Sequence, residues 1–95
     1  MKVSLSKHAL KKIVERELKI SELRKILKNP NFVYYDLHLK TMVAIGETKI
    51  AGVKTNLIIP FVRERNTFKV ITAYPCKDLD REIRKKEGRR WVRIK

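Results

Sequence analysis

The spacing of the apolar residues changes at Pro30, and this change constrains the fold more than any other feature of the sequence. Before Pro30, apolar residues recur with the period of an amphipathic helix. After it, they alternate with polar residues, as in a strand with one buried face. A chain of 95 residues is long enough for a hydrophobic core of its own. The sequence therefore predicts a single α+β domain over residues 1–95, with helices first and a sheet after them.

The segment before Pro30 contains two predicted helices. The apolar stripe of the first, over residues 6–18, consists of Ala9, Leu10, Ile13, Val14 and Leu18. Ser21 is placed to cap a second helix, which Pro30 forces to end at about Lys28 or Asn29. Because the link between the helices is very short, we expect an αα-hairpin.

Four strands are predicted after Pro30, over residues 32–39, 41–49, 56–63 and 67–74. Their close spacing indicates an antiparallel meander. Pro60 lies within the third strand and has no N–H to donate, so that strand is expected at a sheet edge or with a bulge. The alternation in the first strand predicts that Tyr35 is in the core and that Tyr34 is exposed or lines a groove.

The end of the chain predicts a short helix and a tail. Pro75 ends the last strand, Asp78 can cap a third helix, and Gly88 is placed to end it. Residues 89–95 then add a strand or dock on the core. The expected fold is an N-terminal αα-hairpin packed on a four-stranded antiparallel sheet, followed by a short basic C-terminal helix and tail.

The charge is strongly positive, with 24 lysines and arginines against 10 acids and a formal net charge of +14. Nine of these bases lie in the first 29 residues and nine in the last 19. Such a surplus is typical of a phosphate-binding surface, so we expect a nucleic-acid partner, with RNA favoured over DNA. The abundance of Lys, Arg and Glu and the absence of glutamine are also typical of a thermophile, but thermophile ion-pair networks balance the two signs. A basic membrane binder is disfavoured because the apolar residues are explained as core, so no membrane partner is expected.

Several other function classes lack their motifs. Cys76 is the single cysteine, so no internal disulfide can form. The chain shows no signal peptide and no apolar run long enough for a bilayer, and a cytoplasmic protein is expected. It also lacks a phosphate-cradling glycine loop and a Cys/His zinc spacing. We therefore expect no metal and no cofactor, and Cys76 lacks the framework of a nucleophile.

Three short motifs mark the boundaries of the expected elements. Residues 6–10 (Ser-Lys-His-Ala-Leu) open the first helix, residues 27–30 (Leu-Lys-Asn-Pro) close the second, and residues 70–75 (Val-Ile-Thr-Ala-Tyr-Pro) end the sheet. The expected order of two helices, an antiparallel sheet and a basic C-terminal helix resembles the RelE and ParE toxin-like folds, including their BrnT-like branch, and the motifs sharpen this resemblance. Together they are similar to a widespread prokaryotic family related to these toxins. The resemblance covers nearly the whole chain. It implies a small metal-independent endoribonuclease of the toxin–antitoxin type, countered by an acidic antitoxin protein.

Candidate catalytic residues follow from the chemistry of metal-free RNA cleavage. This reaction needs a base for the 2′-hydroxyl, cations for the phosphate charge and an acid for the leaving oxygen. His8 is the candidate base, Arg63 the candidate phosphate clamp and Tyr74 the candidate acid. Each also has a simpler structural interpretation, as a helix-end, turn or core-edge residue.

The candidate nucleic-acid-binding residues are mostly bases of the C-terminal run. They are Lys11, Lys12, Arg65, Arg81, Arg84, Lys85, Arg89, Arg90 and Trp91. Residues 77–95 hold nine bases and four acids, so local pairing cannot neutralise this run. Trp91 offers a stacking plane for a base, although a residue of this kind more often anchors a tail. Three functions stay open: a ribonuclease, a non-catalytic nucleic-acid-binding module of the same fold, and a regulatory subunit that binds an acidic partner.

Overall fold

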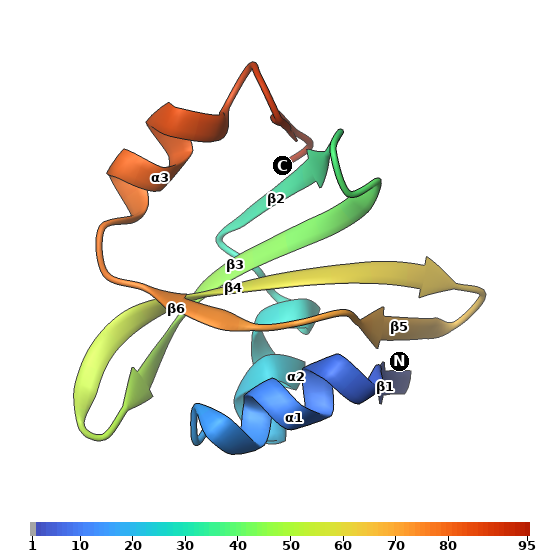
Figure 1. Cartoon of the computed structure of the whole chain (residues 1–95), viewed down its shortest axis with the longest axis vertical. Helices are drawn as coiled ribbons and strands as arrows, with labels where there is room; N and C mark the ends of the chain where they lie inside the picture. The colour runs from blue at the N-terminus through green and yellow to red at the C-terminus, as the bar shows by residue number, and fades with distance from the viewer. Residues whose placement is uncertain (1) are drawn as a thin grey trace.

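Seven strands form one mixed sheet with helices on both faces, in a computed structural model that describes residues 2–95 (Figure 1). In chain order the elements are β1 (Lys2–Leu5), α1 (Lys7–Glu15), α2 (Ile20–Lys28), β2 (Phe32–Asp36), β3 (Thr41–Ile50), β4 (Val53–Glu64), β5 (Thr67–Val70), β6 (Tyr74–Cys76), α3 (Leu79–Lys86) and β7 (Trp91–Arg93). Within residues 2–95, every helix is too short and too polar to span a lipid bilayer.

The sheet is built around the long β3–β4 hairpin. Its strand order is β1-β5-β4-β3-β2-β7, and β6 pairs separately with β4. β1 and β5 run parallel, whereas the other pairs among residues 2–95 are antiparallel. The turn between β3 and β4 consists of Ala51 and Gly52, both with positive φ. This is the backbone of a tight hairpin turn whose twist matches that of the strands.

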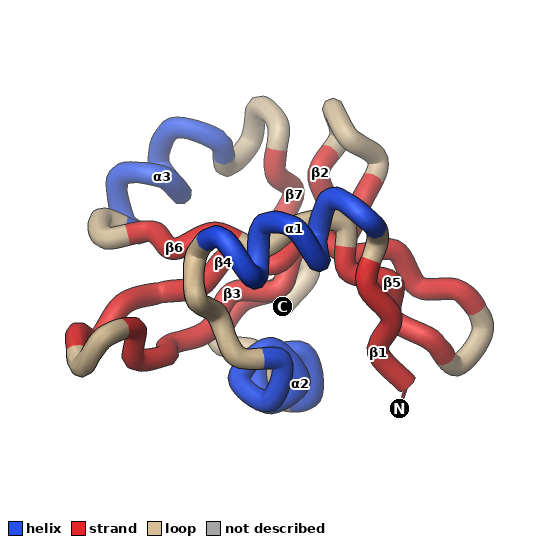
Figure 2. Tube along the Cα trace, turned by 60° about the horizontal axis from the view of Figure 1, so that its bottom comes forward, coloured by secondary structure: helices blue, strands red, loops and turns tan. Residues whose placement is uncertain are grey.

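The predicted architecture, an αα-hairpin on a four-stranded antiparallel sheet, is wrong. Residues 2–5 form a strand that was not predicted, and the predicted strand over 67–74 divides into β5 and β6. Residues 91–93 form a strand, which is one of the two alternatives expected for the tail. β1 and β7 have only four and three residues, so they are strands because of their partners β5 and β2 and not because of their own periodicity. The two N-terminal helices do not run antiparallel either: Figure 2 shows α1 lengthwise and α2 nearly end-on.

One core lies between the sheet and helices α1 and α2. The helices contribute Ala9, Ile13, Leu23, Ile26 and Leu27, all buried against apolar side chains of β3, β4 and β5. Ser6 fixes the start of α1, because its hydroxyl accepts a hydrogen bond from the Ala9 amide at 3.0 Å and donates one to the Ile71 carbonyl at 3.0 Å. α1 is therefore attached to the sheet at its first turn.

α2 packs directly onto the backbone of β3 at Gly46. A Cβ atom at this position would lie 2.8 Å from both Cγ1 and Cγ2 of Ile26. Contacts this short do not occur between carbon atoms in well-packed proteins. The absence of a side chain at Gly46 therefore sets how closely α2 approaches the sheet.

The second core lies on the opposite face, beneath α3. It contains Tyr34, Val43, Ile45, Ile58 and Trp91, with Leu79 and Ile83 of α3 packed against it. α3 thus covers the side chains on this face of β2 and β3.

The prediction that Tyr35 lies in the core and that Tyr34 is exposed or lines a groove is also wrong. Tyr34 is 1% exposed and belongs to the second core, whereas Tyr35 is only partly buried. The prediction counted Leu37 and Leu39 as members of the buried alternation. β2 ends at Asp36, so these two leucines lie in the following turn and are about half exposed.

Pro60 lies inside the sheet rather than at an edge. Its carbonyl accepts a hydrogen bond from the Ile71 amide at 2.9 Å, so it faces the side of β4 on which β5 and β6 pair. In an antiparallel ladder the N–H and C=O of one residue face the same neighbour. The missing N–H of Pro60 therefore falls at residues 71–73, between β5 and β6. Pro75, which was predicted to end the last strand, lies within β6.

Gly46→Ala is expected to lower the free energy of unfolding by about 1–3 kcal/mol, because Ile26 must move away from the new methyl group. Urea denaturation measures this loss. In an Ile26→Ala background both clashing Cγ atoms are gone, so the same substitution should have a smaller effect. An equal loss in the two backgrounds would show that the Gly46–Ile26 contact does not limit the packing of α2.

Candidate nucleic-acid interface

α3 is attached to the sheet at both of its ends. Asp78 caps it, as predicted, and its carboxylate accepts a hydrogen bond from the Arg81 amide at 3.1 Å. Leu79 and Ile83 face the second core. Gly88 follows the helix with φ of +80°, a conformation that glycine adopts readily, and turns the chain toward β7.

The acids Glu82 and Glu87 are occupied by neighbours. Glu82 pairs with Lys86 at 2.6 Å, and both side chains are largely buried. Glu87 accepts a hydrogen bond from the Tyr34 hydroxyl at 2.7 Å. Burial, this hydrogen bond and the negative charge of Glu87 raise the pKa of Tyr34 to about 12. Glu82 is therefore neutralised within α3 itself, and Glu87 links the end of the helix to β2.

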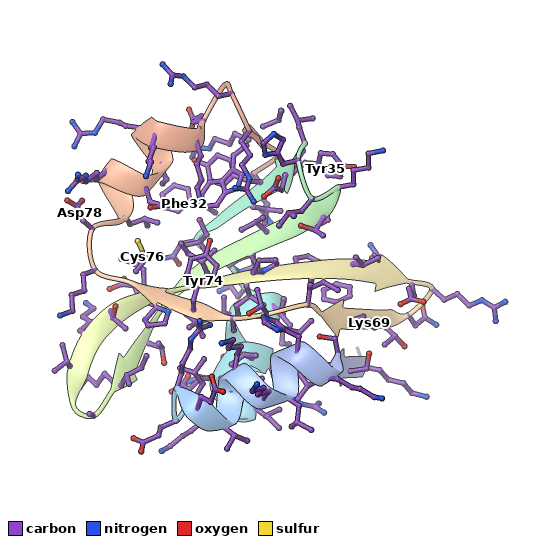
Figure 3. The ribbon with its side chains drawn as sticks, viewed as in Figure 1. Phe32, Tyr35, Lys69, Tyr74, Cys76 and Asp78 are labelled. Atoms are coloured by element: carbon purple, nitrogen blue, oxygen red, sulfur yellow. The ribbon has the colours of Figure 1, made fainter. Side chains whose placement is uncertain are left out.

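The outer face of α3 is mainly basic, with Asp80 as the exposed acid of the helix. Arg81, Arg84 and Lys85 are exposed and lie on one side of the helix, because residues three and four positions apart are neighbours there. Arg89 is exposed just beyond the helix. None of these four side chains forms an ion pair with another residue of the described range 2–95. Nitrogen-tipped side chains project from α3 away from the sheet (Figure 3).

Arg90 and Trp91 do not belong to this exposed surface. Arg90 Nε lies 3.1 and 2.9 Å from the two carboxylate oxygens of Asp36, and Trp91 Nε1 lies 3.2 Å from Oδ2. The Trp91 side chain is 1% exposed, so its ring offers no plane on which a base could stack. Both residues, which the sequence assigned to nucleic-acid binding, instead anchor the C-terminal segment.

The Asp36 carboxylate is buried but remains ionised. Burial alone would raise its pKa, but the hydrogen bonds from Arg90, Trp91 and the Leu39 amide, together with the charge of Arg90, lower it below its usual value. The His38 amide donates a further hydrogen bond to Oδ1 at 2.9 Å. One side chain thus joins the β2–β3 turn to the segment after α3.

Tyr74 lies between β6 and α3. Figure 3 shows Tyr74 and Cys76 on the side of β6 that faces α3, across from Phe32. Burial raises the pKa of Tyr74, the charge of Glu82 raises it further, and the charge of Lys86 opposes both. Burial and Glu82 likewise raise the pKa of Cys76, which makes its thiol a poor nucleophile. The neighbours of Tyr74 are therefore residues of α3.

The three candidate catalytic residues do not converge. His8 is exposed in the first turn of α1, on the opposite face of the sheet from Tyr74. Arg63 lies near the end of β4, with its guanidinium 5.6 Å from the centre of the Phe68 ring. Phe68 packs against the first core, so Arg63 is also on the α1 side. A single phosphate group cannot contact Tyr74 and the other two together.

The remaining candidate bases lie away from α3. Lys11 is exposed on α1, and Lys12 pairs with Glu15 at 3.3 Å. Arg65 is exposed in the turn between β4 and β5, with φ of +54°. These side chains add positive charge to other parts of the surface and do not extend the α3 face.

The structural roles of Lys86 and Asp36 were not predicted from the sequence. Lys86 lies over the Trp91 ring, 4.9 Å from its centre. Its four-residue spacing from Glu82 is a recognisable signal for a helical ion pair. Asp36 had no such signal, because its partners come from the other end of the chain.

Among residues 2–95, no group of three or more His, Cys, Asp or Glu side chains is arranged to hold a metal ion. Comparison with protein-family models, curated proteins and solved structures finds no match for the chain.

Asp36→Asn is expected to lower the free energy of unfolding at neutral pH by about 2–3 kcal/mol, because Arg90 and Trp91 lose an ionised acceptor. Since the folded pKa of Asp36 is depressed, its ionised form stabilises the fold above the unfolded pKa of about 3.9, and this stabilisation is lost as the pH falls below it. Urea denaturation at several pH values measures both effects. The variant should lose this part of the acid dependence, whereas Asp80→Asn, at an exposed position, should change little. Equal stability of the two variants would contradict the anchoring role of Asp36.

Proposed function

We propose that the protein binds the phosphate backbone of nucleic acid through the outer face of α3, which is defined by Arg81, Arg84, Lys85 and Arg89. The observation that carries this proposal is the division of charge around α3. Glu82, Glu87 and Asp36 are each occupied by a neighbouring side chain, whereas the four bases are exposed and have no ion-pair partner within residues 2–95. These bases outnumber Asp78 and Asp80, the other exposed acids of the segment. RNA is proposed over DNA because of the motif resemblance to RNA-cleaving toxins.

Electrostatic binding suits this surface better than base-specific recognition. Arginine and lysine hold phosphate oxygens by charge-assisted hydrogen bonds. The aromatic residue in the run, Trp91, is buried, and the exposed side chains of α3 are charged. The protein should therefore bind many sequences with similar affinity, and its affinity should fall steeply as salt is added.

Removing charge from α3 tests the proposal. The variant Arg84→Gln/Lys85→Gln/Arg89→Gln should bind a labelled RNA about tenfold to a hundredfold more weakly, and the slope of affinity against salt should fall by about one for each lost phosphate contact. Fluorescence anisotropy at several salt concentrations measures both quantities.

The matched control removes the same charge elsewhere. Lys19→Gln/Arg24→Gln/Lys28→Gln changes three exposed bases in and beside α2, on the other side of the sheet. This control should retain most of the affinity and the salt slope. Equal losses in both variants would show that net charge, and not the α3 face, governs binding.

Metal-independent RNA cleavage is a second proposal, and the observation that favours it is the position of Tyr74. Its phenol lies within reach of the charges of Lys86 and Glu82, beneath the basic helix. A phenol with a raised pKa stays protonated and can act as an acid, and the exposed bases of α3 can hold the phosphate.

Incubation of labelled RNA with the protein in EDTA, followed by a denaturing gel, tests this cleavage. If Tyr74 acts as the acid, Tyr74→Phe should abolish discrete products. His8→Ala should leave them unchanged, because His8 lies across the sheet. Binding without products would leave the non-catalytic module as the function.

A further inference from the structure

A groove next to the α3 face has the properties of a site for an unpaired base. It lies between the tip of the β3–β4 hairpin and β6, with a volume of about 620 Å³, within the range of about 300–1,000 Å³ that is typical of small-ligand pockets. Its lining residues are Ile50, Val53, Lys54, Thr55, Pro75 and Lys77. Figure 1 shows the hairpin tip, the segment after β6 and α3 along one side of the molecule.

The lining of the groove is mostly apolar, and its charged members are Lys54 and Lys77. Val53 is 62% exposed in spite of its apolar side chain, and Pro75 is also exposed. The Thr55 hydroxyl donates to the Cys76 carbonyl at 3.3 Å, so its proton is already used. Lys54 pairs with Glu47 at 3.0 Å, whereas Lys77 has no ion-pair partner within residues 2–95.

Lys77 connects the groove to the α3 face. It directly precedes Asp78, the cap of α3, and Arg81 lies in the first turn of that helix. A polyanion bound along α3 would therefore pass Lys77 at the mouth of the groove. The Lys77 ammonium at this end can contact a phosphate, and the apolar lining can pack against the face of a base.

We propose that this groove accepts one unpaired nucleobase of a single strand whose phosphates contact Lys77 and the α3 face. The inference rests on the proposed function, because α3 supplies the electrostatic attraction. A base within a duplex is stacked and paired and cannot enter, so the protein prefers single strands. The groove offers apolar contact and few free polar groups, so the identity of the base matters little.

An abasic strand separates contact with the base from contact with the phosphates. Anisotropy measurements would use three labelled RNAs of equal length: a base-bearing single strand, its abasic counterpart and a duplex. The wild-type protein should bind the base-bearing strand about fivefold more tightly than the abasic strand, which corresponds to partial burial of one apolar contact. Val53→Asn should remove this preference and leave the salt slope unchanged.

Leu39→Asn is the matched control. Leu39 is 54% exposed and lies in the β2–β3 turn, at the other end of β3 from Val53. This variant should keep the preference for the base-bearing strand. Both positions are exposed, so neither substitution disturbs the core.

The outcomes distinguish the groove from the α3 face. Equal wild-type affinity for the base-bearing and abasic strands, with a loss of both in the α3 variant, would overturn the groove site and leave the proposed function intact. A base preference that survives Val53→Asn would also overturn it. Failure of all three RNAs to bind would overturn the proposed function and, with it, the groove site.

Discussion

The C-terminal part of the fold depends on the hydrogen bonds and the ion pair that Arg90 and Trp91 make with the Asp36 carboxylate. α3 has no fully buried residue and β7 has three residues, so neither element has enough packing to hold its position alone. Arg90, which lies between these two elements, and Trp91, the first residue of β7, both donate hydrogen bonds to Asp36. The amides of His38 and Leu39 complete its hydrogen bonds. A buried carboxylate without such partners would strongly destabilise the protein. With these partners, the carboxylate links β2 to the segment that follows α3, beside the second core.

This anchoring divides the basic C-terminal run into two sets with different roles. Lys86 and Arg90 lie inward, where Glu82 and Asp36 neutralise them. The exposed bases of α3 lie outward and repel one another. Because the inner set fixes the helix, that repulsion does not detach it from the sheet. Some bases of this C-terminal run therefore anchor the segment, and others form its exposed surface.

The periodicity of apolar residues located the segments that are long enough to show a helical or strand pattern. It did not locate the short strands that form only because another strand lies beside them. The helical stripe of residues 6–18 and the long apolar strands 41–49 and 56–63 correspond closely to α1, β3 and β4. β1 was not found this way, and β7 was expected only as one of two alternatives for the tail, because both are shorter than one clear period and form only beside β5 and β2. Tyr34 was placed on the wrong face because the alternation was counted through the turn after Asp36. The exposed bases of α3 were predictable from charge alone, but the anchoring role of Asp36 was not, since its side-chain donors lie more than fifty residues away.

Binding and catalysis make different demands on this fold. Charges attract a polyanion over roughly the Debye length, about 8 Å at physiological salt, so exposed bases contribute without converging on a point. A general base or acid must lie within about 3 Å of the proton that it transfers. The sheet separates His8 and Arg63 from Tyr74, which removes the convergence that their joint catalysis would need, while the bases of α3 stay together on one helix face. The same arrangement of layers therefore favours the proposed binding surface on α3, and it would confine the proposed cleavage to Tyr74 and its neighbours.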